Sequence, residues 1–242
     1  MPLHCTRQNC RYSYPNTKFR YTSTEEIKKI IKSLKTKNAH GFDEISIKTL
    51  KWIAPSVSSP LTYIFNKCLK FDSFPSTLKY STVIPIFKTG DKLNMSNFRP
   101  ISLLISSSKI FEKIIYTRIY ARVVLHKILA NEQYGFRSGL STDNACCTLI
   151  QEVLCAMLTV GGIFLYLSKL FDCVNHKILL SKLEHYGIRG TFGALIKSYL
   201  MERYQRFALK DKTNTVNYSN REFVKRGVPQ GSILGPLFLY YT

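Results

Sequence analysis

Three side chains able to bind cations or move protons follow a short apolar run near the middle of the chain. Asp172, Asn175 and His176 come within nine residues after the run Ile163 to Leu167. A run of this length, rich in branched and aromatic residues, predicts a buried strand. Ionisable groups at the end of a buried strand are a common place for chemistry, and a carboxylate there is a ligand for a hard cation.

Two glycine-containing segments place further polar groups where a ligand can approach the backbone. Arg137 lies between Gly135 and Gly139 in a turn-rich loop. Gln230 lies in the segment Gly227 to Pro236 (GVPQGSILGP), just before an apolar helix is expected. Glycines allow close backbone approach at such points. A simple surface arginine and a simple helix-entry turn explain the same patterns.

The composition indicates a folded protein with a polyanionic partner. The chain has 242 residues, 45% of them hydrophobic, and carries 35 Lys plus Arg against 15 Asp plus Glu, a formal net charge of +20. Such an excess favours nucleic acid, because each neutralised phosphate releases counterions. A basic surface that serves only solubility is the alternative. No run reaches the ~18 apolar residues that a membrane helix needs, and the start lacks the apolar core of a signal peptide. We therefore expect a soluble intracellular protein without a membrane partner.

The cysteines predict a reducing compartment rather than disulfides. Seven is an odd number, and five of the cysteines lie inside apolar patterns, where we expect small core side chains: Cys68, Cys146, Cys147, Cys155 and Cys173. His4, Cys5 and Cys10 form a loose cluster near the start. No second pair at ligand spacing follows them, so the sequence does not favour a zinc site.

The first third of the chain predicts a tail and several helices. Residues 1–22 have no apolar periodicity and predict a basic mobile tail. Ser23 and Glu26 form a capping-box pattern before a helix that we expect to end near Lys37. Two further helices are predicted, from Ile45 to Ile53, stopped by Pro55, and from Leu61 to Leu69.

The remainder predicts a mixture of helices and strands. Thr82 to Lys88 predicts a strand, in which Pro85 belongs on an edge or at a bulge. Ser108 to about Leu129 predicts a helix with a basic face formed by Lys113, Arg118, Arg122 and Lys127. Further helices are expected over 144–157, 176–186 and 191–200, and a hairpin pairs 205–209 with 216–224. The expected fold class is α+β.

These segments, in this order, resemble the reverse transcriptase of non-LTR (LINE) retrotransposons, the jockey-like group in particular. The likeness covers about residues 23–241. The matching blocks include Phe98–Leu104 (FRPISLL), Gln133–Arg137 (QYGFR), Leu167–His176 (LSKLFDCVNH) and Gly227–Pro236.

The resemblance implies a right-hand polymerase with fingers and palm built on an antiparallel sheet packed against helices. A polymerase of this type copies an RNA template into DNA from a DNA primer, and two Mg²⁺ ions stabilise the attacking and leaving oxygens. The resemblance also divides the chain into the tail 1–22, a helical N-terminal extension 23–80 and a partial reverse transcriptase domain 81–242.

The chain departs from the family pattern at the metal ligands. Tyr166 stands where the family has its first metal-binding Asp, and a neutral phenol is a poor substitute for a carboxylate on Mg²⁺. Asp172 resembles the second Asp of the same block, which is expected to cap or hydrogen-bond locally. The family's Asp-Asp hairpin and thumb follow the Gly227–Pro236 block, so we expect them beyond Thr242. Apolar faces of the palm should then be exposed.

Other roles follow by resemblance, residue by residue. Arg137 resembles the fingers arginine that contacts the nucleotide triphosphate, and Arg99 is a second candidate for that cluster. Phe171 resembles the gate residue that crowds a ribose 2′-hydroxyl, although a plain core Phe explains it too. Gln230 and Gly231 resemble the loop that lies against nucleotide and template.

The sequence therefore predicts a degenerate reverse transcriptase fragment that is inactive and binds no Mg²⁺. The alternative is a non-catalytic RNA- or DNA-binding protein that uses the basic fingers surface, including the basic face around Lys113, Arg118 and Arg122.

Overall fold

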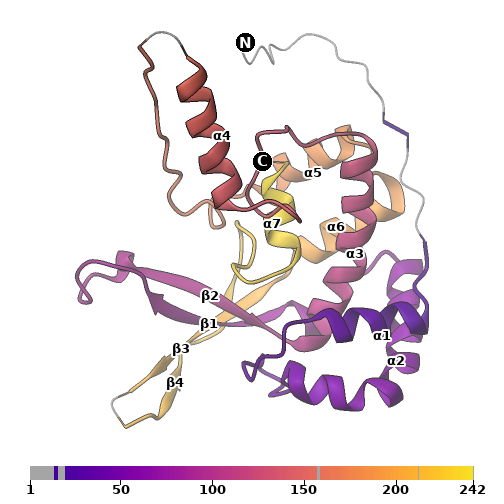
Figure 1. Ribbon diagram of the computed structural model, residues 1–242. Coiled ribbons are helices and arrows are strands. Elements are labelled where there is room, and N and C mark those ends of the chain that lie inside the picture. Colours follow the sequence, from indigo (N-terminus) through magenta and orange to yellow (C-terminus); the bar gives the residue numbers. More distant parts are fainter. Residues whose placement is uncertain (1–13, 16–19, 157–158, 212, 242) are drawn as a thin grey trace.

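A computed structural model of the chain describes residues 14–15, 20–156, 159–211 and 213–241 (Figure 1). Most of the predicted tail and the cluster of His4, Cys5 and Cys10 lie outside these residues. Within them, no helix is long and apolar enough to cross a membrane.

The first helix, α1 (Thr24–Ser33), begins where the sequence predicts. The Ser23 hydroxyl accepts a hydrogen bond from the backbone N–H of Glu26, which satisfies one of the unpaired donors of the first turn. Ile27 and Ile31 are fully buried. The helix ends at Ser33, earlier than the predicted Lys37.

The second helix, α2 (Ile47–Lys70), corrects the prediction of two separate helices. It runs without interruption through Pro55 and Pro60. An interior proline costs about 3 kcal/mol because it lacks an N–H and crowds the preceding turn. The prolines are tolerated because α2 buries one apolar face on both sides of them, and each large side chain such as Phe65 or Leu69 contributes about 1.5–3 kcal/mol.

Five strands form a mixed sheet in the order β2-β1-β3-β4, with β5 also paired to β3. They are β1 (Tyr80–Phe87), β2 (Phe98–Leu104), β3 (Tyr204–Lys210), β4 (Val216–Tyr218) and β5 (Glu222–Phe223). The predicted hairpin is thus present as β3 with β4 and β5. The β1–β3 pair is parallel, so the sheet is not wholly antiparallel. Pro85 is paired only to β2, because β3 covers only Tyr80 to Val83, and this confirms its edge position.

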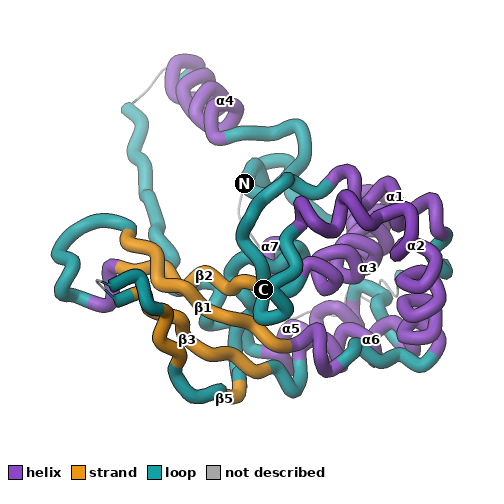
Figure 2. Tube along the Cα trace, turned by 90° about the horizontal axis from the view of Figure 1, so that it is seen from below, coloured by secondary structure: helices purple, strands orange, loops and turns teal. Residues whose placement is uncertain are grey.

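Helix α3 (Ser106–Leu125) is the centre of the core. Its apolar side chains pack with those of α1, α2, α6 (Gly190–Leu200) and α7 (Leu234–Leu239) in one cluster, which α5 (His176–His185) also joins. Figure 2 shows these helices gathered at one end of the sheet, while the β1–β2 hairpin extends away from them. Short 3₁₀ turns, Ser76–Lys79 and Met95–Asn97, precede β1 and β2.

Helix α4 (Thr142–Cys155) stands apart from this core in both views (Figures 1 and 2). It buries no residue. The prediction that the apolar patterns hide their cysteines is therefore wrong for Cys146, Cys147 and Cys155, which are exposed, and for Cys173, which lies in an exposed turn. Cys68 is half-buried.

The run Ile163 to Leu167 does not form the buried strand that its composition predicts. It has no regular secondary structure, and its side chains are 68% to 90% exposed. No strand in the described residues pairs with it, so its backbone polar groups meet solvent.

A buried carboxylate joins three helices of the core. Glu112 of α3 is fully buried and its Oε2 accepts the backbone N–H of Ile233, just before α7, at 2.6 Å. Its Oε1 accepts hydrogen bonds from the hydroxyls of Ser108 and of Tyr199 in α6, both at 3.3 Å. Burial raises the pKa of Glu112, and the positive charge of nearby Arg203 partly offsets this effect.

We predict that Glu112→Ala lowers the free energy of unfolding by about 1–3 kcal/mol for each buried donor that loses its acceptor, these donors being the Ile233 N–H and the hydroxyls of Ser108 and Tyr199. Glu112→Gln keeps an acceptor and costs less. Since the folded-state pKa of Glu112 is raised, its contribution is complete below the unfolded value near 4.5 and is lost as pH rises through the folded pKa.

Urea unfolding across pH measures both effects. The stability of the wild type relative to Glu112→Gln should fall as pH rises, with the exposed Glu25→Gln variant as control. A difference that does not change with pH would contradict a raised pKa.

Candidate functional site

The loop Gly227–Gly231 is where several predicted site segments meet. The N–H of Gly227 donates to the carbonyl of Val174 at 2.9 Å, and the N–H of Val228 donates to that of Phe171 at 2.8 Å. His176 contacts the Gly227 carbonyl through Nε2 at 2.7 Å. The segment that carries Phe171 is thus fixed against this loop by backbone contacts.

The same loop also forms a backbone hydrogen bond with β2, the strand at the edge of the sheet. The N–H of Ser102 donates to the carbonyl of Gln230 at 2.8 Å. Gly231 has φ +130°, and a Cβ at this position would lie 2.7 Å from the Ser102 carbonyl oxygen. Only glycine fits such an approach, which gives a physical reason for the Gly-rich pattern seen in the sequence.

Phe171 lies against this loop, and Arg137 is connected to Phe171 only through its neighbour Phe136. The Phe171 ring is half-buried and meets the Phe136 ring edge to face at 6.3 Å. Arg137, next to Phe136, donates through Nη1 to the carbonyl of Ala130 at 3.2 Å. The guanidinium is therefore held at the Ala130 carbonyl, and this one hydrogen bond uses only one of its five N–H donors.

Arg99 and Tyr166 lie at the far end of the β1–β2 hairpin. Arg99 is exposed on β2, opposite Ile86. Lys88 donates through Nζ to the Tyr166 hydroxyl at 3.1 Å, and its ammonium lies 5.1 Å from the centre of the Tyr166 ring. The Lys88 hydrogen bond and charge lower the pKa of Tyr166, and Arg99 adds to the effect.

This arrangement does not fit a Mg²⁺ ion. Mg²⁺ prefers carboxylate and water oxygens, whereas Tyr166 offers a phenol beside two cations that repel a metal. Asp172 as a whole residue is exposed, but its carboxyl group is partly shielded from water. This shielding raises the pKa of Asp172 and so disfavours the ionised form. Among the described residues there is no group of three or more His, Cys, Asp or Glu side chains able to hold a metal.

Two of the four cations predicted to form a basic face, Arg118 and Arg122, have structural roles, whereas Lys113 lies over the Tyr116 ring and Lys127 is exposed. Arg118 forms an ion pair with Glu26 of α1, through Nη1 and Nη2. Arg122 is buried and donates to the backbone carbonyls of Tyr186 and Pro15. These contacts tie α3 to its neighbours, so the prediction that both arginines belong to a nucleic-acid surface is wrong.

Two residues of the site region were missed by sequence reasoning. Lys88 gave no signal, since its contact with Tyr166 joins positions far apart in the chain. Glu112 did give a signal in the sequence. It lies three positions before Ile115 and seven before Ile119, a helical spacing that places an acid on the buried apolar face of α3. Through Ile233 it holds the segment that follows Gln230 and Gly231.

Comparison with known proteins finds one matching family. The sequence profile of the reverse transcriptase (RNA-dependent DNA polymerase) family matches residues 86–241. The chain is 35% identical to the "Probable RNA-directed DNA polymerase from transposon BS" of Drosophila melanogaster, over 88% of this chain and 23% of that protein. It is 32% identical to the "RNA-directed DNA polymerase from mobile element jockey" of Drosophila funebris, over 90% of this chain and 24% of that protein.

A more distant relative gives a similar alignment. The chain is 30% identical to the "Retrovirus-related Pol polyprotein from type-1 retrotransposable element R2" of Popillia japonica, over 69% of this chain and 22% of that protein. The chain thus spans about a quarter of the length of the curated relatives it matches.

We predict that Lys88→Met raises the pKa of Tyr166 toward its ordinary value of 10.0, because the variant removes both the hydrogen bond and the nearby charge. The measurement is a titration of phenolate absorbance in which the curve of Tyr166→Phe, in each background, is subtracted. Lys92→Met is the control, since Lys92 lies over Phe87 instead. An unchanged Tyr166 titration in Lys88→Met would show that the two side chains do not meet in solution.

Proposed function

The chain belongs to the reverse transcriptase (RNA-dependent DNA polymerase) family of non-LTR retrotransposons, and from that premise we propose that it forms fingers and part of a palm that bind nucleic acid without supporting polymerisation. In this proposal residues 81–242 form the polymerase part and residues 23–80 an N-terminal extension. The observation that carries the proposal is the contact of Tyr166 with Lys88 at the position of the family's first metal ligand.

The proposed nucleotide contacts are those at and around the Gly227–Gly231 loop. Arg137 supplies a planar guanidinium suited to phosphate oxygens. Phe171 presents a half-buried ring beside the loop, and the Gln230 side chain is partly accessible. Support comes from the backbone hydrogen bonds that hold Phe171, Ser102 and this loop together.

The proposed loss of catalysis follows from the chemistry at Tyr166. Phosphoryl transfer in this family requires metal ions to neutralise the charge that develops on the phosphate. At Tyr166 a phenol with a cationic neighbour replaces the carboxylate, so the first ligand position attracts anions rather than Mg²⁺. Lys88 and Arg99 remain able to bind phosphate there.

A second candidate function is non-catalytic binding of RNA or DNA. The net charge of +20 favours it. The exposed cations of the β1–β2 hairpin, Lys88, Lys92 and Arg99, offer a surface that α3 does not, because Arg118 and Arg122 are engaged within the fold. The two candidates share nucleic-acid binding and differ in whether the site also holds a nucleotide.

We predict that the chain binds an RNA-template/DNA-primer duplex in a steeply salt-dependent manner but does not extend the primer with Mg²⁺ and deoxynucleotides. A mobility shift across a salt series measures binding, and primer extension measures catalysis on the same duplex. An active jockey-type reverse transcriptase is the positive control.

Two variants sharpen this test. Arg137→Gln should weaken the binding of a deoxynucleoside triphosphate, and Arg118→Gln should lower thermal stability with little effect on nucleic-acid affinity. Primer extension by the wild type above the level of a mock preparation would overturn the proposed inactivity. The absence of saturable binding at low salt would overturn the proposed function as a whole.

A further inference from the structure

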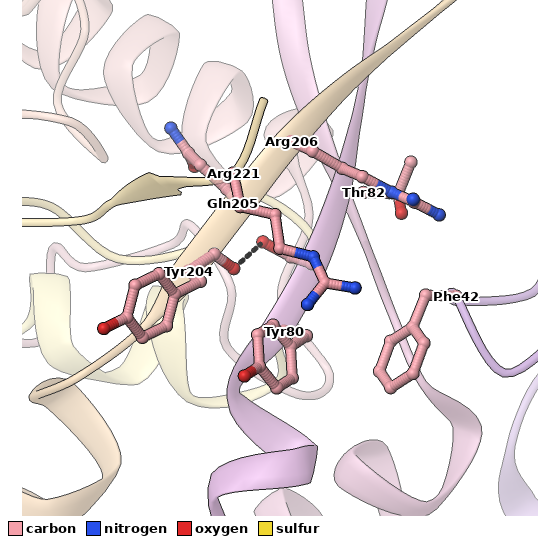
Figure 3. A pocket seen from close by; sticks show the side chains of 8 residues that line it. Phe42, Tyr80, Thr82, Tyr204, Gln205, Arg206 and Arg221 are labelled. Carbon is pink, nitrogen blue, oxygen red and sulfur yellow. Dashed lines mark hydrogen bonds between the residues drawn. The ribbon is translucent and has the colours of Figure 1, made fainter. Parts of the chain in front are cut away.

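Four aromatic side chains form a continuous row on the sheet, away from the residues assigned above. Phe42, Tyr80, Tyr204 and Phe223, here called the aromatic row, come from the α1–α2 loop, β1, β3 and β5. Successive ring centres lie 5.6 Å, 5.8 Å and 5.6 Å apart. Figure 3 shows Tyr204, Tyr80 and Phe42 side by side.

The aromatic row is open to solvent. Phe42, Tyr204 and Phe223 are 39%, 38% and 44% exposed, and Tyr80 is half-buried. The hollow beside Tyr80 and Tyr204 encloses only about 10 Å³, far less than the roughly 300 Å³ that a small-molecule site needs. The hollow is too small to enclose a small molecule. An extended ligand that lies across the surface fits this shape.

Two arginines accompany the rings. The Arg221 guanidinium lies 5.1 Å from the centre of the Tyr80 ring, and Arg206 lies 3.9 Å from that of Tyr218. The hollow is lined by Phe42, Tyr80, Ser81, Thr82, Tyr204, Gln205, Arg206 and Arg221, a set that contains no carboxylate.

Strand register keeps Glu222 off this face. Tyr204 pairs with Phe223 and Gln205 with Glu222, so Glu222 projects to the opposite side from the aromatic row. Tyr80 pairs with Tyr204, and Thr82 pairs with Arg206 two residues further along both strands. Because side chains two residues apart lie on the same face of a sheet, Arg206 shares the face of the rings. The paired parts of β1, β3 and β5 therefore present aromatic side chains and Arg206 on one face.

We propose that the aromatic row with Arg206 and Arg221 is a binding platform for single-stranded nucleic acid, in which unpaired bases stack on the rings and the arginines contact phosphates. Base stacking on aromatic side chains combined with cationic contacts to the backbone is the usual chemistry of single-strand binding. The inference deepens the proposed function, on which it rests, by naming where an unpaired strand lies.

The platform lies away from Arg99 and Lys88 at the far end of the β1–β2 hairpin. Tyr80 precedes Ile86, the partner of Arg99, by six residues of β1, which is about 20 Å at roughly 3.3 Å per residue. A nucleic-acid strand that stacks on the aromatic row would thus lie several nucleotides away from Arg99 and Lys88.

The test is fluorescence anisotropy with a labelled single-stranded RNA of about 12 nucleotides, within the length that one such surface covers. A matched strand that lacks all its bases and a duplex of the same length are measured in parallel, in EDTA and without nucleotides. We expect the wild type to bind the base-containing single strand about 5- to 100-fold more tightly than the abasic strand.

Tyr204→Leu should remove most of this preference and leave binding of the abasic strand unchanged. Arg221→Gln should weaken the binding of both strands and reduce the salt slope by about one. Tyr63→Leu is the matched control, because Tyr63 on α2 is a more exposed tyrosine that also has a cation near its ring, Lys67 at 4.8 Å from the ring centre. Phe223→Leu serves as a second variant if Tyr204→Leu fails to fold by circular dichroism.

Equal binding of base-containing and abasic strands by the wild type, or an unchanged preference in both ring variants, would overturn the platform. In that case, continued binding of the template-primer duplex would leave the proposed function standing. If the wild type binds no nucleic acid at all, both the platform and the proposed function are overturned. That result would point to a protein partner for the aromatic row.

Discussion

The buried carboxylate of Glu112 is the constraint on which the site region depends. A carboxyl group that is fully removed from water needs hydrogen-bond donors, and it finds them in Ser108, Tyr199 and the backbone of Ile233. Each donor comes from a different turn or helix, so all of them must be correctly placed at once. The start of α7 is therefore fixed relative to α3 to within the tolerance of a hydrogen bond.

This constraint reaches the sheet through a few residues of loop. Gly231 lies two positions before Ile233, and its backbone passes close to the carbonyl of Ser102 in β2. A shift of α7 would either break the Glu112 contact or push this loop into the strand. The core thus sets the position of the Gly227–Gly231 loop, and through Val174 and Phe171 it sets the segment that follows the exposed run.

Local signals in the sequence were sufficient where local contacts decide the structure. The Ser23 cap predicted the start of α1, because a cap acts over a few residues. The Gly-rich pattern around Gln230 predicted that a ligand could approach the backbone, and in the structure the close neighbour of Gly231 is the Ser102 carbonyl of β2. Reasoning failed where distant contacts decide. Packing of its apolar face carries α2 through Pro55 and Pro60, and within the described part of the chain no strand pairs with Ile163 to Leu167. The partners of Arg118 and Arg122, on α1 and near α5, cannot be read from the charge pattern of α3.

Under the proposed function, one substitution accounts for both the lost chemistry and the retained binding. An Asp at position 166 would offset the charges of Lys88 and Arg99 and would draw a metal between protein and phosphate. A phenol at that position leaves both cations without an acidic counterpart, so the end of the β1–β2 hairpin attracts phosphate directly. With the aromatic row about 20 Å away along β1, the same sheet then holds a cationic end and a stacking surface. Such a sheet suits retention of a nucleic-acid strand, even though the ligand that once placed the metal is absent.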